Sequence, residues 1–408
     1  MYFCTRMTQS PSRYRTAIIG GGAAGFFLAV NLKEMAPEME VTIFERSHKV
    51  LAKVEISGGG RCNCTNSFDH VTDLSQVYPR GHRLMKRLFN IFDYADAYAW
   101  FEHHGVPLVT QDDDCVFPAS QDSHSIIDCF LHLARQSDVH IRTGMRIQSL
   151  DELSDFDFVV VTTGGQPRLQ GLEWLNGVGE IAPPVPSLFT FNIPDQALRS
   201  LMGTVVDHAS VLLPSTKFRS SGPLLITHWG MSGPAILKLS SYAARWLSEK
   251  DYQCPLCVNW AGLTDAEIIE ELMRLSQQHP QKQLSSVRPF DLPQRLWNYL
   301  LEKSLSGKAV CRWAELGKKD RNRLANILSG DTYNINGRGT FRDEFVTCGG
   351  ISLASVHPQT LESRLRPNLF FAGEILDIDG ITGGFNFQAA WTTAFTVAQA
   401  IANRSSSV

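Results

Sequence analysis

The sequence lacks any apolar run long enough to span a bilayer, and residues 1–14 lack the apolar core of a signal peptide. An excess of one charge is also missing, because 38 Lys and Arg residues stand against 41 Asp and Glu residues. This balance gives no global attraction to nucleic acid or to an anionic membrane. We therefore expect a soluble, cytoplasmic protein with no membrane partner.

Cysteines are few, and their spacing is uninformative. Nine are scattered over 408 residues, and this odd number suits a reducing compartment better than a disulfide framework. Cys62-x-Cys64 is not a CxxC pair, and no further metal ligands accompany it. Cys254 and Cys257 have CxxC spacing but neither a second pair nor a thioredoxin-like context. We interpret both pairs as packing residues and expect no metal site.

The stretch that organises the chain runs from Arg15 to Glu45. An apolar strand leads into Gly20-x-Gly22-x-x-Gly25, a helix follows, and a second strand ends at Glu45, twenty positions after Gly25. With strand, helix and acid in register, this is the dinucleotide-binding βαβ fingerprint. The alternative is a Gly-rich turn in an ordinary α/β core.

Each residue of the fingerprint has a physical role. Gly20 permits the tight turn, Gly22 lets the pyrophosphate approach the backbone, and Gly25 lets the helix lie close to the sheet. The phosphates would bind free N–H groups at the helix N-terminus, where Ala23 and Ala24 lie, and Glu45 would accept from the ribose hydroxyls. These residues do not decide between FAD and NAD(P).

Two further segments have the composition of cofactor loops. Residues 53–66 combine Ser57, three glycines, Arg61 and two asparagines, which offer backbone donors and one cation to a phosphate or a planar ring. The alternative for this segment is a mobile surface loop. An apolar strand at 156–161 ends in Thr162-Thr163-Gly164-Gly165, where a backbone can approach the same dinucleotide, although a tight turn fits equally.

The middle of the chain predicts packing elements. Residues 83–104 and 126–135 read as helices, Pro183 to Ser187 as a stiff crossing between domains, and 235–246 as a helix after a loop containing His228, which we interpret as structural. Residues 264–328 form a helical block that opens with a capping box, Thr264-x-x-Glu267. Its basic cluster, at residues 318–323, is interpreted as a solvated face.

The C-terminus gives the second strong signal. A strand at 369–371 is followed by Gly373, Glu374, Asp379 and a Gly pair, and a long final helix begins after them. Carboxylates at this place can hold ribityl hydroxyls, and the positive helix end can stabilise charge on a reduced flavin ring. The alternative is a helix that only packs.

The chain resembles the HI0933-like (YhiN/BaiN-type) flavoproteins over nearly its whole length. The resemblance rests on the GGGAAG fingerprint, the Ser-Gly-Gly-Gly-Arg-Cys-Asn-Cys-Thr-Asn segment, the Thr-His-Trp-Gly-Met-Ser-Gly-Pro loop, and the run from Val346 through Gly-Glu-Ile-Leu-Asp to Asn386. Many members carry Gly-Ser-Thr-Gly-Asp-Gly-Tyr after the Thr-Gly-Gly strand. Here the shorter Gln166–Leu175 segment follows, so contacts from that loop cannot be carried over.

The resemblance implies an α/β fold of the two-dinucleotide-binding-domain flavoprotein type, with noncovalent FAD in a Rossmann-like domain. It implies a discontinuous FAD domain (1–188 and 343–408), a β-barrel-like second domain (189–258 and 331–342) and a helical insertion (259–330). The residues expected at the cofactor are Gly20, Gly22, Ala23, Ala24, Gly25, Glu45, Arg46, Lys53, Ser57, Gly58, Gly59, Gly60, Arg61, Cys62, Asn63, Ile147, Thr163, Gly164, Gly165, Gly373, Glu374, Asp379, Gly383, Gly384, Phe385 and Asn386.

The leading functional hypothesis is an oxidoreductase that passes a hydride through flavin N5 to a small-molecule acceptor, with unsaturated compounds as the first candidates. NAD(P)H is expected as a transient reductant, because Gly177-Val-Gly179 lacks a preceding strand and the following prolines forbid a helix. The alternatives are a GidA-like nucleic-acid-modifying flavoprotein and a non-catalytic flavin-binding protein. Nucleic acid is not the expected partner, and the sequence leaves the catalytic acid or base and the oligomeric state open.

Overall fold

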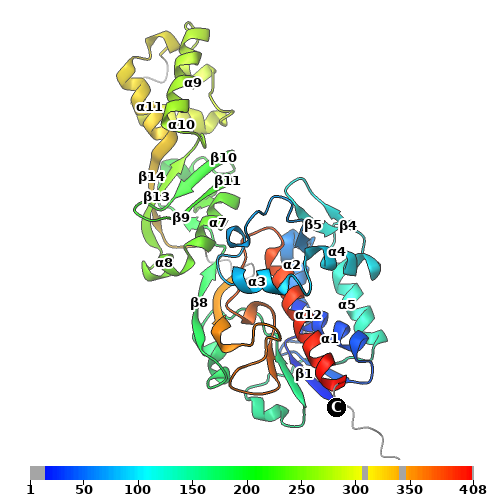
Figure 1. The fold of residues 1–408 in the computed structure, drawn as a ribbon. Coiled ribbons are helices and arrows are strands. Elements are labelled where there is room, and N and C mark those ends of the chain that lie inside the picture. Colours follow the sequence, from blue (N-terminus) through cyan, green and yellow to red (C-terminus); the bar gives the residue numbers. More distant parts are fainter. Residues whose placement is uncertain (1–13, 306–310, 340–345, 407–408) are drawn as a thin grey trace, which may run out of the picture. The chain divides into compact units, whose positions relative to one another are not determined.

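The computed structural model describes residues 14–305, 311–339 and 346–406 (Figure 1). The chain divides into two compact units: one consists of the residues up to 185 and from 346 onward, and the other of residues 186–345. Within the described part of the chain, no helix is long and apolar enough to cross a membrane.

The first unit is built on a five-stranded parallel sheet in the order β16-β7-β1-β2-β6. All four residues of β7 are buried, as expected for a parallel sheet that is covered on both faces. β16 comes from the C-terminal part of the chain and pairs with β7, so both ends of the chain build one sheet. The strands are β1 (Arg15–Ile19), β2 (Glu40–Phe44), β6 (His140–Arg142), β7 (Phe158–Val161) and β16 (Leu369–Phe371).

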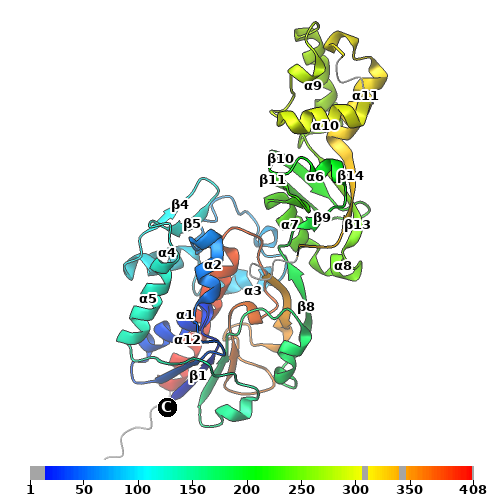
Figure 2. The ribbon, with the colours of Figure 1, turned by 180° about the vertical axis from the view of Figure 1, so that it is seen from behind.

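Two helices from opposite ends of the chain pack side by side in this unit, α1 (Ala23–Met35) and α12 (Phe385–Ser406) (Figures 1 and 2). Each of them follows a strand of the parallel sheet and a glycine-rich turn. The other elements of the unit are α2 (Ala52–Gly60), β3 (Thr65–Asn66), α3 (His82–Leu88), α4 (Tyr94–His103), β4 (Leu108–Thr110), β5 (Cys115–Pro118), α5 (His124–Gln136), β8 (Ile181–Ser187) and β15 (Val346–Ile351).

The second unit contains a six-stranded antiparallel sheet in the order β14-β13-β10-β11-β12-β9. A bridge between Phe191 and Arg338, and a hydrogen bond from Asn192 N to Gly337 O (3.0 Å), bring its two edges together. The result is a nearly closed barrel, as predicted. Its strands are β9 (Phe191–Asn192), β10 (Val205–Leu212), β11 (Arg219–Ile226), β12 (Gly230–Ser232), β13 (Gln253–Asn259) and β14 (Asp331–Asn336).

Helices complete the second unit, and one apolar cluster runs from the sheet into them. The predicted capping box is present, because the Thr264 side chain accepts from Glu267 N while the Glu267 carboxylate accepts from Thr264 N. The helices are α6 (Gln196–Arg199), α7 (Pro234–Tyr242), α8 (Ala244–Glu249), α9 (Asp265–Gln278), α10 (Gln294–Leu305) and α11 (Lys318–Gly330). The three-domain division predicted from the sequence stays a prediction.

Several local expectations differ from the structure. Residues 83–104 form two helices instead of one, because the Asp93 side chain caps a new helix through Ala95 N and Asp96 N. The expected helix at 235–246 likewise divides at Ala243. Residues 183–187 belong to strand β8, which pairs with β15, and are not only a crossing. The extended φ of proline fits such an edge strand.

Candidate cofactor-binding site

The turn between β1 and α1 has the geometry that a dinucleotide requires. A Cβ at Gly20, where φ is +116°, would lie 2.5 Å from the Thr162 carbonyl oxygen, and a Cβ at Gly25 would lie 2.0 Å from the Gly20 carbonyl oxygen. At Gly22, by contrast, no protein atom lies within 4 Å of the Cβ position. Two glycines are therefore needed for packing, and the third leaves space beside the N-terminus of α1, where Ala23 and Ala24 present their N–H groups.

Glu45 lies beside this turn, at the end of β2. Its carboxylate accepts from Gly21 N (2.9 Å) and from Ser47 N (2.8 Å), so two backbone donors fix its orientation. Met145 N donates to Glu45 O (2.9 Å) and places the segment that carries the buried Ile147 nearby. Arg46 is exposed. Contacts of these residues with an adenosine stay predictions.

The Thr-Thr-Gly-Gly segment after β7 contacts the fingerprint turn directly. Thr162 Oγ1 donates to Gly20 O (2.9 Å), which ties the two strand ends together. The next hydroxyl, Thr163 Oγ1, is buried and has no hydrogen-bond partner among the described residues. A buried hydroxyl without a hydrogen-bond partner destabilises the fold. A ligand would supply that partner if it bound in the cradle, the surface formed by the α1 turn, residues 162–165, the α2 glycines and residues 373–386. Gly164 then turns the chain with φ +72°.

An ion pair joins the middle of the cradle. Lys53 Nζ lies 2.9 Å from Glu374 Oε2, and Glu374 Oε1 accepts from Thr347 N (2.9 Å). Burial alone would raise the pKa of Glu374, but the charge of Lys53 and the N–H donors of Thr347 and Gly165 outweigh it, so its pKa is lowered. Glu374 is thus an anion held by three partners, and Gly165 lies so close that a Cβ there would be 2.6 Å from Glu374 Oε1.

The segment predicted as a flexible loop begins as helix α2. Its backbone leaves the helical conformation at Ser57, Gly58 and Gly59, where the two glycines have positive φ. No protein atom lies within 4 Å of the Cβ position of Gly59, and only Glu55 O reaches that of Gly60, at 4.0 Å. The glycines therefore face open space at the helix end, a place where backbone donors can meet a ligand.

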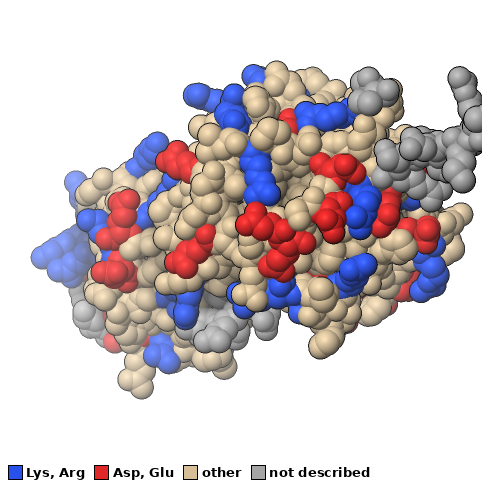
Figure 3. All heavy atoms as spheres, turned by 90° about the horizontal axis from the view of Figure 1, so that it is seen from below, with Lys and Arg blue, Asp and Glu red and all other residues tan. Residues whose placement is uncertain are grey.

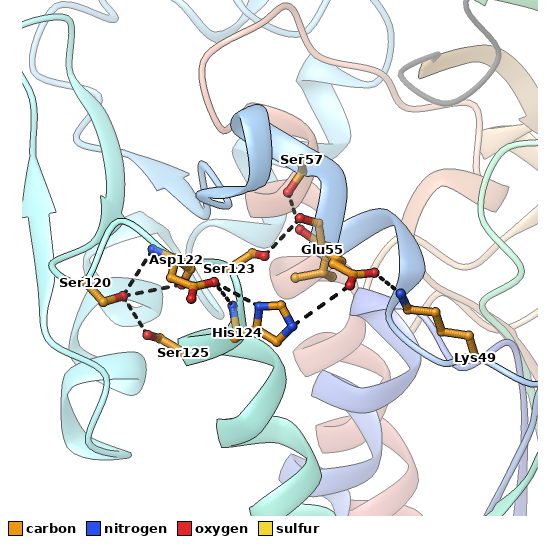
Figure 4. Close-up of polar contacts among 9 residues, drawn as sticks. Lys49, Glu55, Ser57, Ser120, Asp122, Ser123, His124 and Ser125 are labelled. Carbon is orange, nitrogen blue, oxygen red and sulfur yellow. Dashed lines mark hydrogen bonds and ion pairs between the residues drawn. The ribbon is translucent and has the colours of Figure 1, made fainter.

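Arg61 is fixed behind the glycines by contacts that the sequence did not reveal. Its guanidinium lies over the Phe117 ring (4.2 Å to the centroid) and donates to Gly58 O and to Gln121 Oε1, both at 3.2 Å. Ser123, which is buried, donates through Oγ to Glu55 O (2.9 Å; Figure 4). Its backbone N donates to Gly60 O (2.9 Å). Residues 117–123 thus support the glycine segment from behind.

A charged network surrounds this support on the surface (Figure 4). His124 Nδ1 lies 2.9 Å from Asp122 Oδ1, and its Nε2 lies 3.9 Å from Glu55 Oε1. The hydrogen bond with Asp122 raises the pKa of His124, and the hydrogen bond from Lys49 lowers the pKa of Glu55. These groups are exposed enough that water screens their interactions.

The C-terminal glycine pair packs against the N-terminal loop. A Cβ at Gly384 would lie 2.1 Å from Thr65 O, and Asn66 Nδ2 donates to Gly383 O (3.0 Å). The Asn63 amide, oriented to satisfy its neighbours, accepts from Gly384 N (3.2 Å). The two segments predicted to hold the cofactor are therefore in contact, although more than 300 residues separate them in the sequence.

Asn386 and Phe385 begin α12 and hold the preceding loop in place. Asn386 Oδ1 accepts from Gly380 N (2.8 Å), and Phe385 O accepts from Tyr78 OH (2.8 Å). A Cβ at Gly373, where φ is +76°, would lie 2.8 Å from the Ala24 side chain, so the C-terminal turn also touches the start of α1.

Asp379 lies in the loop before α12 and is paired within the fold. It was expected to offer its carboxylate to ribityl hydroxyls, yet it is fully buried, and both carboxylate oxygens accept from the guanidinium of Arg80. An isolated β-bridge joins the same two residues. A contact of this carboxylate with the ribityl chain stays a prediction. Arg80 had no signal in the sequence, because its partner lies 299 positions away.

The cysteines of the loop lie in the core. Cys62 and Cys64 have no exposed surface, and burial raises the pKa of the Cys62 thiol to about 12. Cys254 on β13 also has its pKa raised by burial, to about 11. Thiols with such values stay protonated near neutral pH and are poor nucleophiles. Cys62 and Cys64 thus act in packing.

Comparison with known proteins agrees with this geometry. Two similar proteins are each named ribosomal RNA dihydrouridine synthase: one from Haemophilus influenzae (26% identical, covering 95% of this chain and 98% of that protein) and one from Escherichia coli (27% identical, 95% and 98%). A third, the 3-dehydro-bile acid delta(4,6)-reductase of Clostridium scindens, is 25% identical over 96% of this chain and 99% of its own.

The description of the matching family is HI0933-like protein Rossmann domain, and the match covers residues 14–400. This span includes the fingerprint, the glycine segment of α2 and the C-terminal turn. The chain belongs to the HI0933-like family and is an FAD-dependent oxidoreductase.

Proposed function

We propose that this enzyme takes a hydride from NAD(P)H and delivers it to a carbon–carbon double bond conjugated with a carbonyl group. The observation that carries the proposal is the single cradle made by both chain ends, in which Gly373 touches the start of α1 and residues 63–66 touch the Gly383–Gly384 pair.

The described residues fit FAD. Gly22 and Gly59 leave space where a backbone donor can meet an oxygen, and the buried hydroxyl of Thr163 lacks a partner among the described residues. Lys53 would lie near the middle of the cofactor, while Glu45 would accept from the adenosine ribose. Bound FAD supplies a two-electron carrier that exchanges a hydride at N5.

The protein's own contribution is position and charge. The N-terminus of α12 carries partial positive charge, which favours an anion at this end of the cradle. The buried Arg80–Asp379 pair fixes the loop before α12, so this charge is held in place without rearrangement during the reaction.

The reactions of the relatives support this class of acceptor. A dihydrouridine synthase reduces the double bond of a uracil ring, and a delta(4,6)-reductase acts on double bonds of a 3-oxo steroid. In both, the double bond is conjugated with a carbonyl, so a hydride can add at the far carbon while the carbon beside the carbonyl takes a proton from solvent. We propose an acceptor of this kind, with a small molecule as the first candidate.

Uridine in RNA is the second candidate, favoured by the two relatives that cover 95% of this chain. The face in Figure 3 shows acidic and basic side chains interspersed, so that face offers a polyanion no field of a single sign. An RNA substrate would need to use another surface.

We propose that the reductant, NAD(P)H, binds only transiently. The residues after Gly179 form strand β8 instead of a phosphate-binding helix, so this segment is no second fingerprint. NAD(P)H would then dock near Gly58–Asn63 and Thr382–Asn386 and leave before the acceptor enters. The kinetic consequence is ping-pong behaviour.

Purified protein tests the proposal in two steps. Anaerobic titration with NADH and with NADPH is expected to bleach the flavin absorbance, and reoxidation is then followed with a cyclic enone, with free uridine and with a uridine-containing RNA. Reoxidation by an enone or by a uracil ring supports the proposal. A flavin that neither nicotinamide reduces, or that no conjugated acceptor reoxidises, would overturn it.

A further inference from the structure

The barrel-like unit contains a polar pocket. Its volume is about 490 Å³, a size common for ligand sites. It is lined from β10, β11, β13, α7 and α11, all within the second unit. The lining residues are Ser210, Val211, Leu212, Arg219, Ser220, Ser221, Lys238, Tyr242, Cys257, Asn259 and Ser329.

The lining is rich in donors and contains no carboxylate. Three of its polar groups are occupied within the fold. Ser220 Oγ donates to Ala235 O (2.5 Å), Asn259 Nδ2 donates to Leu263 O (2.7 Å), and Ser329 Oγ donates to Ala325 O (3.0 Å). These contacts fix α7, the end of β13 and α11, so the walls of the pocket are held by the fold itself.

Tyr242 also interacts within the fold, which leaves four nitrogen or oxygen donors in the lining. Arg219, Lys238, Ser210 and Ser221 make no side-chain hydrogen bond or ion pair within the described residues. Ser210 and Ser221 are Cα partners across β10 and β11, and Arg219 lies two positions before Ser221, on the same face of β11. Lys238 adds a second cation from α7.

Two cations and two hydroxyls without acceptors favour an oxyanion, because each can donate and neither cation has a competing carboxylate in the pocket. We infer that this pocket binds a phosphate group. Arg219 would contribute its planar guanidinium, Lys238 a point charge, and the paired serines the remaining hydrogen bonds. The phosphate could belong to a small phosphorylated molecule or to the backbone of a nucleic acid, and the experiment separates these sources.

The test uses the FAD-loaded protein and two double variants of equal charge change. Arg219→Gln with Lys238→Gln removes both pocket cations. Lys318→Gln with Lys319→Gln removes two exposed lysines of α11, also in the second unit, and serves as the matched control. Flavin absorbance and thermal unfolding establish that both variants are folded.

Pyrophosphate and a single-stranded RNA twelve-mer are titrated by calorimetry at several salt concentrations. We expect the pocket variant to lose about tenfold or more in affinity for at least one probe, while the control stays within about twofold of wild type. Loss for pyrophosphate indicates a small phosphorylated ligand. Loss for RNA alone, with a salt slope reduced by about one to two, indicates a nucleic acid backbone.

Two results would overturn the inference. One is wild-type protein that binds neither probe. The other is a control variant that loses as much affinity as the pocket variant, because binding would then follow net charge and not this pocket.

Discussion

Each compact unit buries one aspartate, and the two buried carboxylates are stabilised by different sets of hydrogen-bond donors. Among the described residues, Asp379 in the first unit and Asp331 in the second are the only charged side chains that are almost fully buried. Asp379 is paired with the guanidinium of Arg80. Asp331 accepts from Lys303 Nζ (2.6 Å), Trp260 Nε1 (3.1 Å) and Tyr333 OH (2.5 Å).

The difference lies in how each charge is shared. The guanidinium satisfies both oxygens of Asp379 in a fixed plane and holds the loop that precedes α12. Asp331 begins β14 and has three donors, one from α10, one from β14 itself and one from the residue after β13, so it joins the sheet to α10 without depending on one partner. A charge with one principal partner is more vulnerable than a charge with three.

Replacing Arg80 with Gln is expected to have the largest effect. The buried Asp379 carboxylate would lose its cation, and the free energy of unfolding should fall by about 3–5 kcal/mol. Urea unfolding of the FAD-loaded protein measures this loss, and Arg80→Lys, which keeps the charge, should lose less. A loss in Arg80→Gln below about 0.5 kcal/mol would contradict this account.

Replacing Lys303 with Met should cost less than the Arg80 change. Asp331 keeps the indole and the phenol as donors, so we expect a loss of about 1–3 kcal/mol. The same unfolding measurement applies, with Lys318→Met as a control for removing an exposed lysine of the same unit. If Lys303→Met is as damaging as Arg80→Gln, three donors protect a buried charge no better than one.

The glycines of the first turn offer a comparison within one motif. Gly25→Ala places a Cβ 2.0 Å from Gly20 O and should destabilise the protein by about 1–3 kcal/mol. Gly22→Ala meets no protein atom within 4 Å, so the apoprotein should keep its stability while FAD affinity falls by about tenfold. Apoprotein unfolding and fluorescence titration with FAD separate the two effects. Equal destabilisation by both changes would rule out distinct roles.

The sequence predicted the backbone features of this site better than its side-chain pairs. Glycine positions, strand ends and helix starts depend on short sequence patterns. The α1 turn and the Thr264 cap could therefore be predicted from the sequence. Arg80 and Ser123 gave no signal, because their partners are distant in sequence and only packing brings them together. The pairing of Asp379 with Arg80 could not be predicted for the same reason, and its contact with the cofactor stays a prediction.

The start of α2 was missed for a different reason. Residues 53–60 contain several glycines, which lower helix propensity, and composition therefore predicted a loop. In the structure, the helix holds until Ser57, and the glycines take the positive φ values that end it. Contacts from Ser123 to Glu55 O and Gly60 O stabilise a segment that propensity alone would not form.

The smallest expected effect concerns the Lys53–Glu374 pair. The pKa of Glu374 lies below its ordinary value of 4.5, so this group contributes stability above pH 4.5 that is lost as the pH falls through the lowered value. Lys53→Met removes the cation that lowers the pKa of Glu374. The burial of Glu374, which raises that pKa, remains. Because Lys53 is more than half exposed, the variant should lose no more than about 1 kcal/mol at pH 7.

The pH dependence distinguishes this electrostatic role from a packing role. As the pH falls through the lowered pKa of wild-type Glu374, the carboxylate becomes protonated in both folded proteins, so the difference in unfolding free energy between wild type and Lys53→Met should shrink. Lys53→Arg, which keeps the charge, should follow the wild-type curve. Unfolding by urea between pH 3 and pH 7 measures all three proteins. A difference that stays constant over this range would mean that the Lys53 chain stabilises the cradle by its alkyl contacts and not by its charge.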